Sequence, residues 1–580
     1  MTMAPRPARS PLSAPAETAS TLNGGNVANQ ASTAVVRSEN ILAWLEDPAT
    51  DTGLRFADGD GWQLHPYAEL SMRARRAATL LQAAGVRPGS TVLVVCPTSP
   101  DFVAMFFGTL LSGATPATVG IPASFQSRTA YLAHIDRLRR LVGPAAIATT
   151  PELRSSLGDV TEILGTPVVT DSGESDVDLS APLPLSDIGI LQFSSGSTAE
   201  PKGVRVSLEA INANVTSIRD WLDWGPDDRL VSWLPLHHDM GLVGGLLAAM
   251  SRSSDIWLLR PDQFIRSPHR WLSAFSEMSA TTSASPTFGL AHVLRRVRPA
   301  DLDGLDLSTW RTLIVGAERV EPAVLRSFAD LLAPYGFRRE VLLPAYGLAE
   351  VTLAASATRP RTGWRSVTVD PASLALGQPV GVRTTGQGTE ITSCGTALPA
   401  MGLRILDEAG EPLPDGTFGE IEVSGPSLAQ GYVGADDAGH FARGALPTGD
   451  AGFLLHGELY VVGRLGDSLK QLGKWVFAEE IERVAVDVSP RPNRTVAMLG
   501  TLDGRDTAVV VVEGIDPIGA ALVGKALTKH ALGLRVEVRR GRTGWIQRTT
   551  SGKPMRRKMW ERLVDDPALT ELLWHGDERE

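Results

Sequence analysis

The first half of the chain alternates short apolar runs with segments in which apolar residues recur at helical spacing. The apolar run 91–95 predicts a buried strand, and apolar residues within 67–81 fall on one face of a helix. A second amphipathic helix is expected over 101–114. The remaining expected elements are an early helix at 41–45 and strands at 145–149, 167–170, 188–193 and 313–315. This alternation predicts parallel sheets covered on both faces by helices.

The second half carries patterns typical of mixed and β structure. Residues 402–432 predict a small β subdomain, and 452–462 predict a hairpin that turns at His456-Gly457. Beyond residue 466, strands alternate with two helices, expected at 478–487 and 519–532. The predicted fold class is therefore α/β. A large N-terminal domain would hold parallel α/β subdomains and a β subdomain, followed by a small C-terminal α+β domain.

Length and composition narrow the classes of function. A chain of 580 residues is longer than one ordinary core supports, so two or three domains are expected. The net charge of −10 argues against a nucleic-acid or anionic-membrane partner. No apolar run reaches the roughly 18 residues of a membrane span, so no transmembrane helix is expected. Residues 1–35 are rich in Ala, Pro, Ser, Thr and Asn, which predicts a disordered tail rather than a signal peptide.

The two cysteines, Cys96 and Cys394, lie far apart in the sequence. They form neither a metal-ligand spacing nor a disulfide framework, which indicates a reducing compartment and a cytoplasmic protein. Cys394 lacks a neighbouring base of the kind that a Cys/His pair requires, so we interpret it as structural.

The apolar run 188–193 leads into the most distinctive stretch of the sequence. It stops in five small residues, Ser194, Ser195, Gly196, Ser197 and Thr198. Pro201-Lys202-Gly203 then leads toward a helix near Leu208. Hydroxyls, backbone N–H groups and one lysine are what a polyphosphate requires. A flexible Gly/Ser linker is the alternative, but a linker need not follow a buried strand or end in a Pro-Lys-Gly turn.

This stretch resembles the phosphate loop of the adenylate-forming superfamily, which includes acyl-CoA synthetases, fatty acyl-AMP ligases, nonribosomal adenylation domains and luciferases. Lys202 and Gly203 match the family pattern, whereas Ala199 stands where a glycine is usual. The resemblance extends from about Tyr67 to Lys558, with the signatures in the family order. It implies that ATP and a carboxylic acid form an acyl adenylate, which a pantetheine thiol then attacks.

Two further stretches resemble the family's acyl-binding elements. His237 and His238 precede Asp239 in a string similar to the family's Leu-Pro-x-x-His-Asp-Met-Gly-Leu element. The resemblance implies that this turn lies between the acyl tunnel and the nucleotide, with His238 catalytic and His237 in the acyl pocket. From the residues alone, an ordinary polar turn capped by Asp239 remains the alternative. Ser285 and Pro286 lie in a stretch that resembles the substrate-pocket strand and turn.

The nucleotide is expected to contact several later segments. The resemblance assigns adenine contacts to the turn Gly316-Ala317-Glu318, base stacking to Tyr346 beside Gly347, and the ribose to Asp450. Arg464 is the expected phosphate or ribose contact. Glu350 is a hard oxygen ligand suited to Mg²⁺ together with Thr198, although a solvated residue at a helix start is the alternative for Glu350.

The C-terminal part departs from the family in places. Gly466 occupies the hinge position, beyond which the resemblance implies a mobile lid. Residues 366–379 resemble the insertion of fatty acyl-AMP ligases, whereas Gly473-Lys474-Trp475 resembles the pantetheine loop of aryl-CoA ligases. Lys553 matches the catalytic lysine of adenylation, which stabilises charge on the carboxylate and α-phosphate. Gln547 and Pro554 differ from the usual residues beside that lysine.

The sequence thus predicts a tail at 1–35, a substrate-binding domain at 36–465 and a lid at 466–580. We expect an acyl-CoA ligase that uses ATP, Mg²⁺ and CoA to activate a large apolar carboxylic acid through an acyl adenylate, with release of AMP. One alternative is a fatty acyl-AMP ligase that loads an acyl carrier protein. Another is a protein limited to thioesterification or to binding acyl adenylates. The acid, the acceptor and the oligomeric state stay open.

Overall fold

The structure of the protein is a computed structural model in which most of the chain beyond residue 39 is described. The described ranges are 40–122, 128–157, 165–171, 182–194, 202–384, 388–434, 441, 444–471, 474–528, 530–531, 533–548 and 554–576. Residues 39–580 cluster as one unit. In the described part of the chain, no helix is both long and apolar enough to cross a bilayer.

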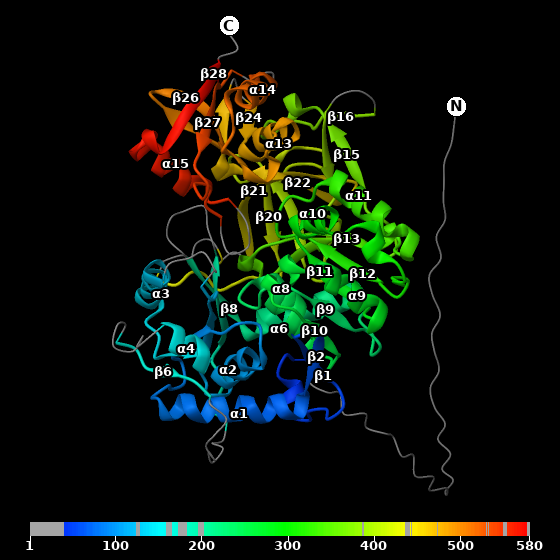
Figure 1. Ribbon diagram of the computed structural model, residues 1–580, viewed down its shortest axis with the longest axis vertical. Coiled ribbons are helices and arrows are strands. Elements are labelled where there is room, and N and C mark those ends of the chain that lie inside the picture. Colours follow the sequence, from blue (N-terminus) through cyan, green and yellow to red (C-terminus); the bar gives the residue numbers. More distant parts are fainter. Residues whose placement is uncertain are drawn as a thin grey trace, which may run out of the picture. The chain divides into compact units, whose positions relative to one another are not determined.

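A six-stranded sheet occupies the N-terminal part, with the order β6-β5-β3-β4-β7-β8 (Figure 1). All neighbouring strands are parallel except the last pair, β7 and β8. Helices α1 and α2 pack against each other beside this sheet (Figure 1). The bounds are β3 Thr91–Val95, β4 Thr115–Thr118, β5 Ala146–Thr149, β6 Val168–Val169, β7 Ile188–Ser194, β8 Lys202–Ser207, α1 Tyr67–Ala83, α2 Pro100–Leu111, α3 Arg128–Val142 and α4 Pro151–Leu157.

A nine-stranded sheet follows, with the order β18-β14-β13-β12-β11-β9-β10-β1-β2. Its strands β1, β10, β9, β11, β12 and β13 are parallel neighbours, and antiparallel strands close both edges. The strands are β1 Gly53–Asp58, β2 Gly61–Pro66, β9 Leu230–Ser232, β10 Ile256–Leu258, β11 Thr282–Ser285, β12 Thr312–Val315, β13 Leu342–Gly347, β14 Ala354–Ala357 and β18 Thr396–Ala397. The helices are α6 Leu208–Leu222, η2 Met240–Leu247, α7 Ala248–Met250, α8 Pro261–Arg266, α9 His269–Glu277, α10 Thr287–Arg296 and α11 Pro322–Leu332.

Two antiparallel sheets form the expected β subdomain. The three-stranded sheet is β16-β15-β17, and the four-stranded sheet is β19-β20-β21-β22. The hairpin β21–β22 turns at residues 456–457, as predicted. The strands are β15 Ser366–Val369, β16 Val382–Arg383, β17 Thr389–Thr392, β19 Gly402–Leu406, β20 Gly419–Ser424, β21 Ala445–Leu455 and β22 Glu458–Arg464.

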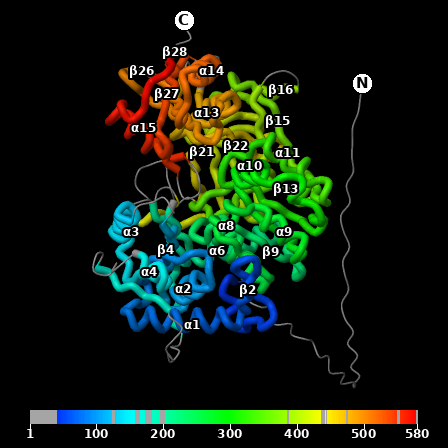
Figure 2. The backbone as a smooth tube through the Cα atoms, viewed as in Figure 1, coloured from blue at the N-terminus to red at the C-terminus, as the bar shows by residue number. Residues whose placement is uncertain are grey.

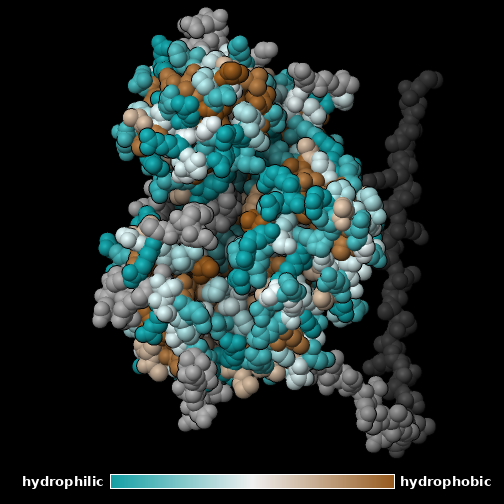
Figure 3. Space-filling model, in the orientation of Figure 1, coloured by the Kyte–Doolittle hydropathy of each residue, from teal (hydrophilic) through white to brown (hydrophobic). Residues whose placement is uncertain are grey.

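Beyond the 3₁₀ turn η8 (Leu465–Asp467), every strand pairs within the C-terminal segment. A hairpin, β23–β24, precedes the four-stranded sheet β25-β26-β27-β28. On α14, Ile518 is 83% exposed and Leu522 is 56% exposed. Figure 3 shows brown, apolar surface at the top of the view, where Figure 1 places the C-terminal elements. The elements are β23 Ser468–Gln471, β24 Lys474–Phe477, α13 Ala478–Val488, β25 Thr495–Leu502, β26 Arg505–Glu513, α14 Pro517–Thr528, β27 Arg535–Gly541, α15 Arg556–Asp565 and β28 Thr570–Gly576.

The α/β fold class with its β subdomain and C-terminal α+β part is confirmed, and one local prediction is wrong. The expected helix at 41–45 is a single 3₁₀ turn, Ala43–Leu45. The helix expected near Leu208 is confirmed as α6, Leu208–Leu222, and an unpredicted strand, Lys202–Ser207, precedes it. In that strand only Lys202 and Arg205 are exposed, and the other four residues are buried. Pairing with β7 stabilises the extended backbone.

Candidate functional site

The predicted phosphate loop lies at the turn of the β7–β8 hairpin. The last paired residues are Ser194 and Lys202. Residues 195–201, which include the predicted ligands Ser195, Gly196, Ser197 and Thr198, lie outside the described residues. The chain therefore leaves the sheet at Ser194 and re-enters it at Lys202.

Lys202, Tyr432 and Glu350 form one cluster at this end of β8. The ammonium Nζ of Lys202 lies 4.8 Å from the ring centroid of Tyr432. The Tyr432 hydroxyl donates a hydrogen bond of 2.8 Å to Oε1 of Glu350. Glu350 lies in the 3₁₀ turn η6, Ala349–Val351, which follows the end of β13. The cluster joins three segments that are remote in sequence.

A second cluster surrounds the carboxylate of Asp450, which is only 7% exposed. The Tyr346 hydroxyl donates to Oδ2 at 2.8 Å, and Nε of Arg464 donates to Oδ1 at 3.1 Å. Burial, and then the negative charge of Asp450, raises the pKa of Tyr346 well above its usual range. The negative charge of Asp450, and to a smaller extent that of Glu350, raises the pKa of Arg464.

The two clusters are connected by the end of β13. A Cβ on Gly347 would lie 1.7 Å from the carbonyl oxygen of Leu353, so only glycine fits there. Tyr346 precedes this close approach and Glu350 follows it. The backbone thus places an aromatic ring and a carboxylate within one turn of the same strand end.

The predicted adenine turn follows β12. Ala317 has a positive φ of 67°, and a Cβ on Gly316 would lie 2.8 Å from the carbonyl oxygen of Ala345 in the neighbouring strand. Glu318 does not point freely into solvent, because its Oε1 accepts a 2.6 Å hydrogen bond from the backbone N–H of Phe288. This turn is therefore held tightly against β13 and the start of α10.

The His237-His238 turn leaves β9 and enters the π-helix η2, whose N-cap is Asp239. Thr118 and Gln192 each donate a hydrogen bond to the carbonyl oxygen of His237, at 3.4 and 3.3 Å. Its Nε2 is enclosed without a partner among the described residues. Burial, and then the charge of His238, lowers the pKa of His237 well below its usual value. His237 is therefore neutral and faces the end of the six-stranded sheet.

Ser285 and Pro286 end β11 and begin α10. The Ser285 hydroxyl is fully buried and donates to the carbonyl oxygen of Pro286 at 2.9 Å. Trp233, which stacks on Phe264 with ring centroids 3.9 Å apart, fills the space beside this turn. The predicted acyl-pocket residues thus border an aromatic wall.

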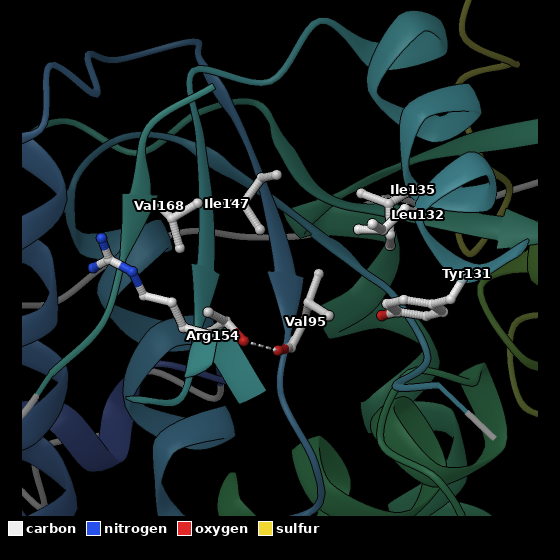
Figure 4. Close-up of a pocket in the computed structure, with 8 residues that line it drawn as sticks. Val95, Tyr131, Leu132, Ile135, Ile147, Arg154 and Val168 are labelled. Carbon is white, nitrogen blue, oxygen red and sulfur yellow. Dashed lines mark hydrogen bonds between the residues drawn. The ribbon is translucent and has the colours of Figure 1, made fainter. Parts of the chain in front are cut away.

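Neither of two hollows in the structure contains these residues. The hollow between α3 and strands β3, β5 and β6 holds about 20 Å³, which is about the room of one water molecule (Figure 4). Thr149 donates across it to the carbonyl oxygen of Val95 at 2.7 Å. A polar hollow of about 240 Å³ lies beside Arg359, Arg365 and His456. Neither one has the apolar length that a large acyl group requires.

The expected hinge and lid residues lie beyond β22. Gly466 lies in η8, and Trp475 lies on β24, facing the ammonium of Lys470 at 6.0 Å. Lys474 begins β24, whereas Gly473 lies outside the described residues. Glu480 on α13 accepts a 2.7 Å hydrogen bond from Thr389 of the β subdomain and pairs with Arg319 at 3.5 Å. The C-terminal part is therefore held to the larger part by these polar contacts and by Phe477, which is buried against Phe418 of the β subdomain.

Lys553 also lies outside the described residues, whereas Arg556, three residues later, lies within them. Arg556 begins α15 and pairs with Glu479 at 3.2 Å, Glu482 at 2.9 Å and Asp467 at 3.7 Å. Burial, together with the negative charges of Asp467 and Glu482, raises the pKa of Glu479, although Arg556 opposes this shift. Arg556 thus connects the end of the lysine loop to the hinge turn η8.

The described residues fit a magnesium–nucleotide complex. Within the described ranges, no group of three or more His, Cys, Asp or Glu side chains could hold a metal ion. Mg²⁺ is commonly bound by one or two carboxylates together with substrate phosphates, and the oriented carboxylate of Glu350 beside Lys202 suits that mode. Asp450 can accept further hydrogen bonds, because a carboxylate has about four acceptor sites and two are used.

Sequence reasoning missed Tyr432 and Arg556. Tyr432 lies 82 residues from its partner Glu350, so no local pattern connects them. The Gly-Tyr pair at 431–432 ends the predicted β subdomain, which was the only signal available.

Known proteins resemble this chain over most of its length. The family model described as AMP-binding enzyme matches residues 45–433. A Caulobacter vibrioides protein provisionally named an acyl-CoA synthetase is 32% identical, over 85% of this chain and 89% of its own. The long-chain-fatty-acid–AMP ligase FadD26 of Mycobacterium marinum is 32% identical, over 73% of this chain and 76% of its own.

A solved structure from a study of fatty acyl-adenylate ligases of E. coli and L. pneumophila has the same fold. It superimposes with a TM-score of 0.83 at 30% identity, covering 91% of this chain and 98% of that one.

Proposed function

Because this chain belongs to the family of AMP-binding, adenylate-forming enzymes, we propose that it activates a long-chain or similarly large apolar carboxylic acid and passes it to a pantetheine thiol. In the first step the carboxylate attacks the α-phosphorus of ATP and pyrophosphate leaves. In the second step the thiol sulfur attacks the acyl carbonyl, the thiol proton is lost to solvent, and AMP leaves.

The observation that carries this proposal is that one strand end, β13, bears two clusters. One joins Tyr346, Asp450 and Arg464, and the other joins Glu350 through Tyr432 to Lys202 at the phosphate hairpin. Asp450 would accept the ribose hydroxyls, and the turn 316–318 and Tyr346 would contact the adenine. The loop 194–198 and Lys202 would bind the phosphates. Glu350 and Thr198 would hold Mg²⁺, which offsets the charge of the polyphosphate when bound. Lys553 would stabilise charge at the α-phosphate.

We propose CoA as the acceptor. Two observations support it, the resemblance of Gly473-Lys474-Trp475 to the loop of aryl-CoA ligases and the likeness to a protein named an acyl-CoA synthetase. A carrier protein is the second candidate, which the likeness to fatty acid–AMP ligases favours. The domain division at Gly466 belongs to this proposal, because lid rotation there would exchange Lys553 for the Lys474–Trp475 loop.

A single-turnover experiment tests both steps. Enzyme, ATP, Mg²⁺ and a long-chain acid are mixed, and acyl-AMP is followed by mass spectrometry before and after addition of a thiol. We expect acyl-AMP to accumulate and to be converted to acyl-CoA when CoA is added. Conversion only by a phosphopantetheinylated carrier protein would identify the second candidate instead.

A further inference from the structure

Tyr432 contacts both charged groups that flank the predicted phosphate loop. Its hydroxyl donates to Oε1 of Glu350 at 2.8 Å, and the Lys202 ammonium lies 4.8 Å from its ring centroid. We propose that Tyr432 is a positioning residue that orients the Glu350 carboxylate toward the metal ion accompanying the nucleotide. This inference rests on the proposed function, and it assigns a role to a residue outside the predicted site.

The backbone around Tyr432 explains why its side chain is well placed. The segment 429–433 runs beside β8 and forms an isolated bridge between Tyr432 and Val204 (Figure 2, near 430 in yellow). Within this segment, the backbone N–H of Ala429 donates to the carbonyl oxygen of Glu350 at 2.9 Å, and the backbone N–H of Val433 donates to the carbonyl oxygen of Gly203 at 2.8 Å. One short segment therefore ties the end of the phosphate hairpin to the turn that carries Glu350.

The hydroxyl of Tyr432 restrains the last side-chain torsion of Glu350, which the backbone does not determine. The carboxylate of a glutamate rotates about its last side-chain bond with broad, weakly defined minima. A hydrogen bond to Oε1 selects one plane and leaves the other oxygen to the metal ion. Metal-ligating carboxylates are themselves usually hydrogen-bonded, and losing such a partner weakens metal binding by about 10–100-fold.

The ring of Tyr432 has a separate role toward Lys202. A cation above an aromatic face is attracted to it, but weakly at an exposed site. The ammonium is therefore held near the phosphate hairpin and can still move to a polyphosphate. Tyr432→Phe removes the hydroxyl and keeps this ring contact, so the variant isolates the effect on Glu350.

Binding of Mn²⁺ with a non-hydrolysable ATP analogue, measured by electron paramagnetic resonance without any acid substrate, tests the inference. In Tyr432→Phe we expect the Mn²⁺ dissociation constant to rise about 10–100-fold, with the affinity for the metal-free analogue within about twofold of the wild type. Tyr335→Phe is the matched control, because its exposed hydroxyl donates to the carbonyl oxygen of Pro299. The midpoints of thermal unfolding of Tyr432→Phe and Tyr335→Phe should be the same.

A double-mutant cycle with Glu350→Gln separates positioning from a general structural role. If Tyr432 acts through Glu350, Tyr432→Phe weakens Mn²⁺ binding no further in the Glu350→Gln background. Equal weakening in both backgrounds, or unchanged binding in Tyr432→Phe, would overturn the inference. Those results leave the proposed function standing, whereas a wild-type protein that fails to bind the Mn²⁺–nucleotide complex overturns both.

Discussion

Asp450 is oriented by its own protein before any nucleotide binds. Its two oxygens accept hydrogen bonds from Tyr346 and Arg464, and Asp450 itself is buried. Hydrogen bonds to a charged group contribute about 1.5–3 kcal/mol, so the orientation is firmly held. A ribose would meet a carboxylate that is already fixed in one plane.

Tyr346→Phe is therefore expected to raise the KM for ATP about tenfold, because one of the bonds that orient Asp450 is lost. The ATP dependence of pyrophosphate exchange measures it, with Tyr335→Phe as control. A fall in kcat with an unchanged KM would speak against orientation of the ribose ligand.

His237 makes stability depend on pH. Its folded-state pKa lies well below the usual value, first through burial and then through His238. Below about pH 6.5 the unfolded chain binds a proton that the folded chain does not, so stability falls as pH falls. Between pH 6.5 and 5 the thermal midpoint of the wild type should drop more steeply than that of His237→Asn. Identical slopes would contradict the enclosed neutral imidazole; the exposed His575→Asn is the control.

Single residues were predictable where their role follows from a local motif. Glu350 and Asp450 lie next to recognisable neighbours, Tyr346-Gly347 and Thr448-Gly449, so the sequence singled them out. The hydrogen bond from Tyr432 to Glu350 and the enclosed Nε2 of His237 depend on segments that meet only in the folded chain. The spacing of apolar residues along the sequence carries no information about such contacts.

At the scale of elements, the end of β13 depends on close approach of two backbones. A methyl group on Gly347 would overlap the carbonyl oxygen of Leu353, which follows the turn carrying Glu350. The backbone must shift to relieve this overlap, and both Tyr346 and Glu350 would move with it.

Gly347→Ala should consequently lower the exchange rate by roughly 100-fold and destabilise the fold by about 1–3 kcal/mol. Exchange kinetics and thermal unfolding check these two effects. Gly61→Ala is the control, because its nearest neighbour, the carbonyl oxygen of Asp58, lies 3.8 Å from the added carbon. Normal exchange in Gly347→Ala would mean that this strand end does not position the site.

Elements were predictable where the apolar period is strong. The strand at 91–95 was predicted with its observed bounds, and the helix from residue 67 extends only two residues further than expected. The strand Lys202–Ser207 was missed because only four of its residues, 204–207, alternate between apolar and polar, and a Pro-Lys-Gly turn suggested a loop. Pairing with β7 stabilises it, and pairing partners cannot be read from a short segment alone.

At the scale of the molecule, the question is how the lid moves. Glu480 ties α13 to Thr389 and Arg319, and Arg295 donates to Asn493 at 2.7 Å. An apolar contact accompanies these polar ones, because Phe477 at the end of β24 is buried against Phe418 of the β subdomain. Rotation of the lid would have to break both kinds of contact. Gly466 has no described atom within 4 Å of the place where a Cβ would lie.

Gly466→Ala should fold normally and gain about 0.4–1 kcal/mol, since alanine restricts the unfolded chain. It should leave pyrophosphate exchange unchanged and slow thioester formation several-fold, if rotation uses the freedom of glycine. Rapid-quench measurements give the rate of each half-reaction separately. If Gly466→Ala matched the wild type in both half-reactions, Gly466 would not be the hinge.

The fold class of the whole molecule was predictable from the sequence, but the distribution of its strands between sheets was not. Alternating strands and helices indicated parallel sheets, yet the chain divides them between a six-stranded and a nine-stranded sheet. Nothing in the pattern says which strand joins which sheet, because each buried strand has the same apolar run. The match to known adenylate-forming structures, and not the periodicity, supplies that arrangement.

The central claim is acid-dependent adenylation, and exchange of labelled pyrophosphate into ATP tests it most directly. The assay would use long-chain, aryl and polycyclic acids, with Lys553→Ala as the inactive reference. We expect exchange with long-chain or other large apolar acids, and none with Lys553→Ala. Absence of exchange with every acid, while preformed acyl adenylate and CoA still give thioester, would contradict it and leave a thioesterifying enzyme.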